Sequence, residues 1–240
     1  IGTTEPEGRL TVLDEPHRME EFPPRPMIAY EDYMDGHGTF KVTADPAREQ
    51  TSASLASSQQ AWRMFSKVSS GASYILPNAG PPNGDNEHDG WRSIGSDYDS
   101  ITGLPNLAGY FQGEQGAWAQ IQLPYKIKLD NFDLQPGGDD TGIVNSHRFP
   151  KIITIFGYNE NGWTKILDKQ ATTFPNHSYS TTIGYSRSIE FQKFKVHSNQ
   201  YYNKFVILVN QTWSGFIGAA TSVANIGQWR LFGIREQGQS

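Results

Sequence analysis

The sequence predicts an all-β protein, organised as an antiparallel β-sandwich or jelly roll. From about residue 39 onward, short segments in which apolar and polar residues alternate follow one another, and turn residues separate them. The 240 residues include 24 Gly and 14 Pro, a composition that favours many turns over long helices. Only the stretch SSQQAWRMFSK, at 57–67, suggests a helix, and we expect that helix to be short.

The stretch WAQIQLPYKIKLDNFDLQP, at 118–136, holds two strand-like runs on either side of a Pro-Tyr pair. In the second run Ile127 and Leu129 point to one side, whereas Phe132 and Leu134 fall out of phase with them. One extra residue at 130–131 would restore the phase, because a β-bulge places two residues of one strand opposite one residue of its partner. We therefore predict a bulge there, with both apolar pairs on the core side.

Later segments predict further strands and a tight hairpin. Asn161 and Gly162 form a strong hairpin signal, because a type I′ turn requires positive φ at both central residues. The run FVILV, at 205–209, is apolar on both faces, which predicts a central strand covered on both sides. Trp118, Trp163 and Trp229 lie in predicted strands and are expected to pack. The large apolar residues expected in the core are Ile121, Leu123, Ile153, Ile155, Phe205, Ile207 and Leu231.

Residues 1–38 differ from the rest in composition. The segment EPHRMEEFPPRPM, at 15–27, combines charge with prolines, which carry no N–H and disfavour helices and central strands. We expect a short extended N-terminal arm or linker over 1–38, followed by the sandwich at 39–240. Either this arm docks on a neighbouring subunit, with a closed homotrimer as the favoured assembly, or it is a disordered leader.

Composition and motifs exclude several classes of function. The formal net charge of −5 leaves no basic footprint for nucleic acid, no apolar run is long enough for a membrane span, and a chain without cysteine has no disulfides or thiolate metal sites. The six histidines are scattered without metal-ligand spacing, and neither a nucleophile elbow nor a phosphate-binding glycine loop is present. We therefore predict that the protein is not an enzyme. The chain begins at Ile1 without a signal-peptide pattern, so we expect a processed piece or a fragment of a longer protein.

A series of motifs resembles the discoidin-like domain, the coagulation-factor C-type domain of the galactose-binding-like fold. In chain order they are LASSQQAWRMF (55–65), GWRS (90–93), WAQIQLP (118–124), GYNENGWTKI (157–166), YNKFVILV (202–209) and WRLFG (229–233). The resemblance spans residues 40–236 and implies a β-sandwich of the galactose-binding-like type. The chain departs from the pattern at Gln122, where Asp is usual, at Pro124, where Gly is usual, and at Lys204 and Phe205, where an Arg-Tyr pair is usual. No particular ligand is therefore carried over.

The first twelve residues, IGTTEPEGRLTV, are similar to stretches in fibre and adhesin proteins of phages and large viruses. Together, the two resemblances imply a non-enzymatic recognition module of a virion surface or fibre protein, on the virion surface or extracellular. Its expected partners are glycan on the host cell surface and neighbouring subunits of a fibre or capsid. Two alternatives stay open: a carbohydrate-binding module of a glycoside hydrolase, and a purely structural capsid or fibre component.

Sugar binding requires an aromatic platform beside hydrogen-bonding groups, because a pyranose ring offers C–H groups on one face and hydroxyls around its edge. The region 69–110 is long for a loop in a compact domain, and such loops usually carry function. We expect loops at one end of the sandwich to contact the ligand. The candidate contact residues are Tyr74, Trp91, Arg92, Tyr98, Tyr110 and Trp213.

Alternating carboxylates in NGDNEHDGW, at 83–91, suggest a metal site. Asp85, Glu87 and Asp89 could supply the hard oxygen ligands that Ca²⁺ prefers. The alternative is a solvated acidic loop. The stretch PGGDDTG, at 136–142, is a weaker candidate of the same kind.

Overall fold

The structure is a computed structural model, and it describes residues 18–45, 60–67, 90–94, 96–137, 148–175, 191–213 and 223–237. Within these residues the regular structure is β-strand apart from one short 3-10 helix, which confirms the all-β prediction. The elements in chain order are β1 (Glu20–Phe22), β2 (Glu31–Met34), β3 (Gly38–Ala44), the 3-10 helix η1 (Ala61–Phe65), β4 (Trp91–Arg92), β5 (Tyr110–Phe111), β6 (Glu114–Gln115), β7 (Ala117–Gln135), β8 (Pro150–Asn159), β9 (Gly162–Ala171), β10 (Gln192–Lys195), β11 (Tyr202–Thr212), β12 (Asn225–Ile226) and β13 (Gln228–Arg235).

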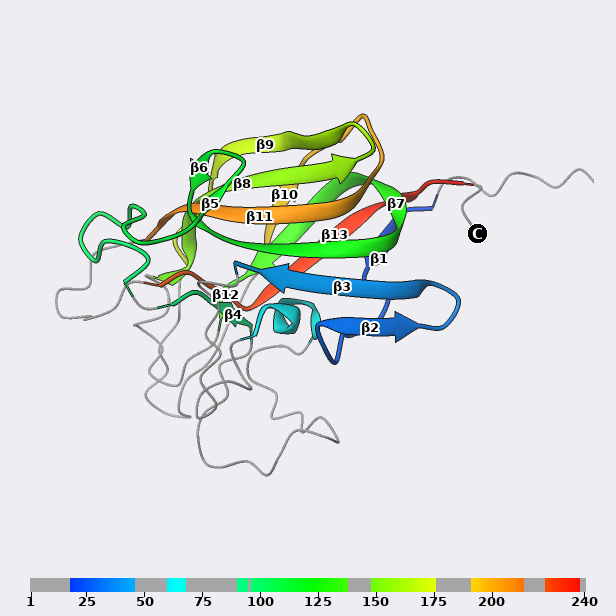
Figure 1. The fold of residues 1–240 in the computed structure, drawn as a ribbon, viewed down its shortest axis with the longest axis horizontal. Helices are drawn as coiled ribbons and strands as arrows, with labels where there is room; N and C mark the ends of the chain where they lie inside the picture. Colours follow the sequence, from blue (N-terminus) through cyan, green and yellow to red (C-terminus); the bar gives the residue numbers. More distant parts are fainter. Residues whose placement is uncertain are drawn as a thin grey trace, which may run out of the picture.

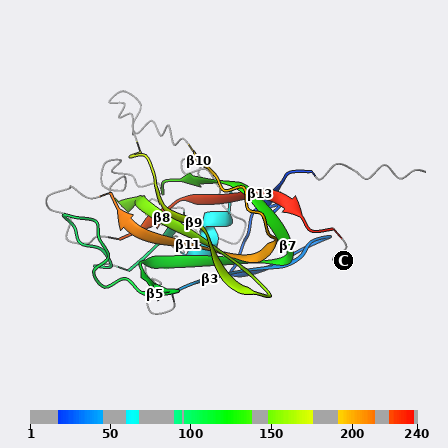
Figure 2. The same ribbon diagram turned by 90° about the horizontal axis from the view of Figure 1, so that it is seen from above.

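One nine-stranded antiparallel sheet is folded into two layers by the long strand β7. The first half of β7 pairs with β3 and β11, and its second half pairs with β13 and β10. The first layer therefore has the order β2-β3-β7-β11-β8-β9, and the second has the order β1-β13-β7-β10. Figures 1 and 2 show β10 and β13 lying behind the layer that contains β3, β11 and β8. The predicted antiparallel sandwich is confirmed.

A β-bulge in β7 marks the passage from one layer to the other. Strand β13 pairs Phe232 with Asn131 and Gly233 with Leu129, so Asp130 is the extra residue in β7. As a result, the apolar side chains before and after the bulge are fully buried: Ile127, Leu129, Phe132 and Leu134. The bulge predicted at 130–131 is therefore confirmed.

The main core lies between the two layers. All seven residues that the sequence assigned to the core are at most 1% exposed: Ile121, Leu123, Ile153, Ile155, Phe205, Ile207 and Leu231. The helix η1 contacts β3, β4 and β13. Its Phe65 ring packs against Trp229 with 5.6 Å between ring centroids. The predicted short helix thus closes the core beside β3 and β13.

A second, smaller apolar cluster lies on the outer face of the first layer. Val206 and Leu208 of β11 are buried there with Phe156 of β8. The partly buried side chains that pack over them are Phe111, Trp118 and Trp163. The run at 205–209 is therefore covered on both faces, as predicted. Trp118, Trp163 and Trp229 all pack, although only Trp229 is fully buried.

The hairpin between β8 and β9 forms as predicted, but its turn lies one residue earlier. Asn159 pairs with Gly162, which leaves Glu160 and Asn161 as the turn residues. Of the predicted pair, only Gly162 has positive φ, at 101°. The Asn161 backbone N–H donates to the Asn159 side-chain oxygen at 3.0 Å. This local hydrogen bond favours a turn that begins at Asn159 and leaves a glycine alone at positive φ.

Residues 20–34 belong to the sandwich, which corrects the predicted arm at 1–38. Strand β1 pairs with β13, and β2 pairs with β3. Phe22, Met27 and Met34 are at most 1% exposed. The sequence-based boundary was wrong because the prolines occupy the connection between β1 and β2, where they interrupt no strand. Residues 1–17 lie outside the described residues, so the arm stays a prediction for that segment.

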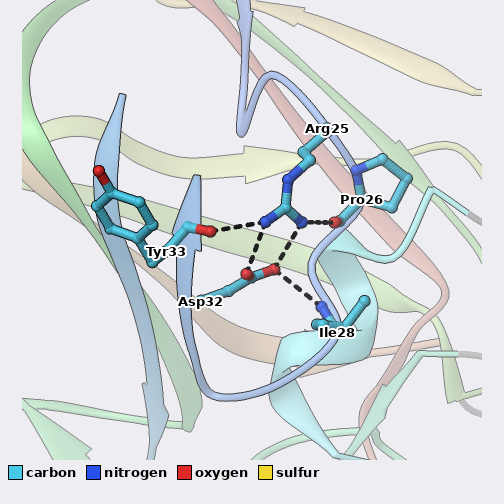
Figure 3. A network of polar contacts seen from close by, with 5 residues as sticks. All are labelled: Arg25, Pro26, Ile28, Asp32 and Tyr33. Carbon is cyan, nitrogen blue, oxygen red and sulfur yellow. Dashed lines mark hydrogen bonds and ion pairs between the residues drawn. The ribbon is translucent and has the colours of Figure 1, made fainter. Parts of the chain in front are cut away.

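An ion pair holds this proline-containing connection against β2 (Figure 3). The Arg25 guanidinium donates to both Asp32 carboxylate oxygens, at 3.0 and 2.9 Å, and to the Tyr33 carbonyl oxygen at 2.7 Å. The same carboxylate accepts the Ile28 backbone N–H at 3.2 Å. Asp32 is buried, and a bidentate arginine–carboxylate pair fixes geometry as well as charge. The connection between β1 and β2 is therefore held in the domain by specific polar contacts.

Deleting Asp130 should unfold the domain, whereas Asp130→Ala should leave it folded. The deletion removes the bulge, and a one-residue slip turns Phe132 and Leu134 to the outer face. Truncating one such core side chain costs about 2–5 kcal/mol, and a whole domain has only about 5–15 kcal/mol. Asp130→Ala keeps the extra residue and removes a partly exposed carboxylate with its contacts to Asn131 and His197. Thermal melts followed by circular dichroism check this, and equal melting of the deletion variant and the native chain would contradict it.

A chain that begins at Arg18 should fold cooperatively, whereas a chain that begins at Gly38 should not fold. The shorter chain lacks β1 and β2, and with them the buried side chains of Phe22, Met27 and Met34. Urea unfolding followed by tryptophan fluorescence distinguishes the two. A cooperative transition at an unchanged midpoint in the shorter chain would show that 18–37 is dispensable.

Candidate functional site

One end of the sandwich collects strand ends from both layers. Strand β7 starts there at Ala117, runs to the far end, and returns along the second layer to Gln135, which pairs with Gln228 at the start of β13. The register places the start of β8 and the end of β11 at the same end, because Pro150 pairs with Thr212. We call this region the loop end, and Figure 1 shows the described part of the loop at 96–110 beside it.

The loop that precedes β5 is anchored in the core by Tyr98. Its phenol donates to the Val209 carbonyl oxygen at 2.7 Å and accepts the Ala117 backbone N–H at 2.8 Å. Burial raises the pKa of Tyr98 well above its ordinary value, and the hydrogen bond from Ala117 opposes that rise. The phenol therefore stays neutral and joins the loop to the start of β7 and to β11.

Asp99 shapes the next turn of this loop. One carboxylate oxygen accepts the Thr102 backbone N–H at 2.7 Å, the Thr102 hydroxyl at 2.8 Å and the Ile101 backbone N–H at 3.0 Å. These hydrogen bonds, with the Thr102 amide first, lower the pKa of Asp99. Gly103 then approaches β11 so closely that a Cβ there would lie 2.1 Å from the Thr212 carbonyl oxygen. The turn is therefore fixed against the residue that precedes Trp213.

Trp213 is half-buried at the loop end, and several partners fix its ring. The indole N–H donates to the Thr172 hydroxyl at 3.1 Å. Phe174 packs edge-on at 5.4 Å between ring centroids, and the Lys151 ammonium lies 5.3 Å from the ring centroid. The backbone N–H of Trp213 donates to the Phe149 carbonyl oxygen at 3.1 Å. The indole is thus a positioned, partly exposed ring with an ammonium beside it, because the Thr172 hydroxyl that holds it is buried and also donates to the Pro150 carbonyl oxygen.

The loop at 96–110 also exposes large apolar side chains. Ile101 is 80% exposed, Tyr110 is 68% exposed, and Leu104 and Leu107 are about half exposed. The loop is nevertheless held by backbone bonds, since the amides of Asn106, Leu107 and Ala108 all donate to the Asp97 carbonyl oxygen. A rigid segment that keeps apolar side chains in water is typical of an interaction surface.

Two predicted contact residues are core residues instead, which corrects the sequence-based assignment. Trp91 is 1% exposed, and its strand β4 pairs with β12. Tyr98 is 2% exposed and serves as the anchor described above. A ring without an exposed face cannot stack on a ligand. The prediction failed because the Gly-rich sequence before Trp91 is typical of a loop, whereas in the structure β4 pairs with β12 and contacts η1.

The remaining predicted contact residues that the structure describes differ in exposure and in position. Tyr110 is exposed on β5, Trp213 is half-buried at the end of β11, and Arg92 is half-buried opposite Asn225. Tyr74, Asp85, Glu87 and Asp89 lie outside the described residues, as does most of the stretch at 136–142. The structure therefore brings Trp213 close to the loop at 96–110 but does not describe the predicted calcium ligands.

Sequence reasoning missed the partners of Trp213. Lys151 is the second residue of β8, whereas Thr172 and Phe174 follow β9, so only the sheet register brings them to Trp213. No local sequence signal could have found them. Ile101, Leu104 and Leu107 did carry a signal, since large apolar residues in a loop rich in Gly and Pro have no strand partner to cover them.

Metal and membrane features can be judged only for the described part of the chain. There, no group of three or more His, Cys, Asp or Glu side chains is placed to hold a metal ion. Calcium binding by the acidic stretch at 83–91 stays a prediction. In the same residues, no helix has the length and apolar composition needed to cross a bilayer.

Comparisons with known proteins found structural likeness only. No protein-family model matches the chain, and no curated protein sequence matches it. A family 32 carbohydrate-binding module of NanJ from Clostridium perfringens, solved with galactose, is 11% identical over 80% of this chain and 93% of its own, with a TM-score of 0.45. A chitobiase C-terminal domain from Bacteroides fragilis is 12% identical over 86% of this chain and 99% of its own, with a TM-score of 0.45.

Another family 32 carbohydrate-binding module from Clostridium perfringens, solved with GalNAc-β-1,3-galactose, is 11% identical over 80% of this chain and 94% of its own, with a TM-score of 0.42. At TM-scores below 0.5, these likenesses assign neither a fold nor a ligand to the chain. The all-β sandwich is established here by the strand pairing itself.

Asp99→Ala should loosen the loop at 99–104 without unfolding the domain. The amides of Ile101 and Thr102 lose their acceptor and should exchange with solvent faster in hydrogen-exchange mass spectrometry. Because the pKa of Asp99 is lowered in the folded state, its contribution is present above the ordinary pKa and is lost as pH falls through the lowered value. The native loop should therefore gain exchange, corrected for intrinsic rates, only in acid. Asp35→Ala, an exposed carboxylate in another turn, is the control, and identical exchange in both variants would refute the role of Asp99.

Proposed function

We propose that this domain is a non-enzymatic recognition module that binds glycan at the loop end, with Trp213 as the centre of the site. The observation that carries the proposal is the partly exposed indole of Trp213, fixed by its hydrogen bond to Thr172, with the Lys151 ammonium beside the ring. This combination suits a pyranose, which needs an apolar ring face and polar groups around its edge. The discoidin-like motifs carry over no particular ligand, so a broad glycan panel that includes galactose-type sugars is the first test.

In this proposal, the sugar C–H face stacks on the indole, and its hydroxyls bond to polar groups around it. Lys151 donates from one side, and Gln211 lies near the turn because its amide donates to the Thr102 carbonyl oxygen at 2.7 Å. The ring is already held by Thr172 and Phe174, so little side-chain freedom is lost on binding. Tyr110 and the exposed aliphatic residues of the loop at 96–110 extend the contact surface. No bond in the sugar needs to be broken by these groups.

A single shallow site of this kind binds weakly, so attachment requires several sites at once. This requirement supports a setting in which many copies are displayed, such as a virion surface or a fibre. Display on a virion or fibre, the trimer and an extracellular location are the finer parts of the proposal. They rest on the motif at residues 1–12. Light scattering on the intact chain and on a chain that begins at Arg18 tests assembly through the N-terminal segment, because the second chain keeps every described strand.

Two other functions remain as alternatives within the proposal. A carbohydrate-binding module of a glycoside hydrolase would use the same site, and the coding sequence on either side of this chain distinguishes it. A purely structural capsid or fibre component would use the exposed residues Ile101, Leu104 and Leu107 for subunit contacts. A glycan array that shows no signal, together with a stable oligomer, would favour the structural function.

Trp213→Ala should abolish glycan binding and leave a folded domain, whereas Trp91→Ala should destabilise the domain. Trp213 is half-buried at the surface, but Trp91 is 1% exposed, and truncating a buried aromatic costs about 3–5 kcal/mol. Glycan-array screening followed by calorimetric titration measures binding, and thermal melts measure stability. Tyr110→Ala, at a strongly exposed position, should weaken binding without a change in melting temperature. A folded Trp213→Ala variant with native affinity would place the site elsewhere.

A further inference from the structure

The outer face of the first layer carries a row of side chains that crosses the strands at right angles. Its members come from β3, β7, β11, β8 and β9, and successive members are paired in the sheet. We call them the transverse row: Lys41, Gln122, Lys204, Tyr158 and Trp163. Because paired strands lie roughly 4.8 Å apart, the row spans about 19 Å. It also lies about 17 Å along β7 from Ala117, at roughly 3.3 Å per residue, and is separate from the loop end.

Aromatic rings occupy one end of the transverse row. Tyr158 and Trp163 lie 5.1 Å apart between ring centroids, and both are half-buried. Phe111 of the β5–β6 hairpin packs edge-on against Trp163 at 4.9 Å, which fixes that indole. Trp163 helps to cover the outer apolar cluster, but Tyr158 is not a member of that cluster. Tyr158 therefore adds aromatic surface beside Trp163 that is not needed to cover the outer apolar cluster.

Lys204 lies at the centre of the transverse row, and its ammonium is not paired with a carboxylate of the described residues. The Lys204 ammonium is 4.8 Å from the Tyr158 ring centroid. Three other lysines of this layer are paired with carboxylates: Lys41 with Glu31, Lys126 with Glu160, and Lys165 with Glu114 and Asp168. Among the described residues, Lys204 has no carboxylate within ion-pair distance. Its partner on the other side is Gln122, a neutral hydrogen-bonding side chain.

We propose that the transverse row is a second binding surface, for an acidic oligosaccharide that carries carboxylate or sulfate groups. A sugar ring packs against Tyr158 and Trp163, and its acidic group accepts hydrogen bonds from the Lys204 ammonium. The Gln122 amide and then Lys41 lie along the path of the next sugar units, since the spacing of strands is close to the length of one unit. The charge of Lys204 favours an acidic ligand, because a neutral chain offers its ammonium no opposite charge.

Calorimetric titration of the intact chain tests this surface with three probes of equal length. They are a heparin-derived tetrasaccharide, which carries sulfate, an oligogalacturonate, which carries carboxylate, and a neutral galacto-oligosaccharide. We expect at least one acidic probe to bind, and its affinity to fall as salt rises from about 0.05 to 0.5 M. Lys204→Gln should weaken that binding about tenfold or more, as expected for the loss of a hydrogen bond to a charged group.

Matched variants separate this surface from general charge attraction and from the loop end. Lys195→Gln removes an exposed lysine from β10 in the other layer and should leave acidic binding unchanged. Trp213→Ala should also leave it unchanged. Tyr158→Leu should weaken it while Trp163 stays packed on Phe111. The proposal is overturned if no acidic probe binds, if the neutral probe binds equally well at the row, if Lys204→Gln keeps native affinity, or if Lys195→Gln loses as much as Lys204→Gln.

Discussion

The architecture depends on one strand that belongs to both layers. Strand β7 has 19 residues, and the bulge at Asp130 allows its apolar side chains to face the core before and after the change of partners. The bulge also constrains the opposite strand: a Cβ at Gly233 would lie 2.5 Å from the Lys128 carbonyl oxygen, so only glycine fits there. Because β7 leaves the loop end at Ala117 and returns to it at Gln135, this bend brings strand ends of both layers to the end of the sandwich where Trp213 lies.

Much of the fold could be predicted because its signals are local. Alternating apolar residues predicted strands, and the break in phase between Leu129 and Phe132 was enough to place the bulge. The layer order could not be predicted, because it depends on which distant strands pair. The N-terminal boundary failed for a related reason: the prolines before Met27 argue against a strand only where they lie, and the sequence gives no sign that Arg25 reaches Asp32 to dock the connection beside β2.

The candidate site was less predictable than the fold. Aromatic residues in loop-like sequence were reasonable candidates, yet burial separates Trp91, which the core holds, from Trp213, which keeps an exposed part. That distinction is tertiary, because Trp91 lies in the short strand β4, Trp213 follows β11, and both have polar neighbours in the sequence. The partners of Trp213 come from β8 and from the segment after β9, so sheet register alone assembles them. The transverse row has the same origin, since Lys204 and Trp163 lie far apart in sequence.

The most direct test of the central claim is a two-dimensional ¹H–¹⁵N NMR titration of the intact chain with a galactose-containing oligosaccharide. If the loop end binds glycan, the Trp213 indole resonance and the backbone amides of 101–104, 149–151, 172–174 and 211–213 should shift together and saturate. Resonances of the transverse row, including the Trp163 indole, should stay in place with this neutral ligand. Saturable shifts confined to other regions, or no shifts at millimolar ligand with any member of a broad glycan panel, would contradict glycan recognition at the loop end.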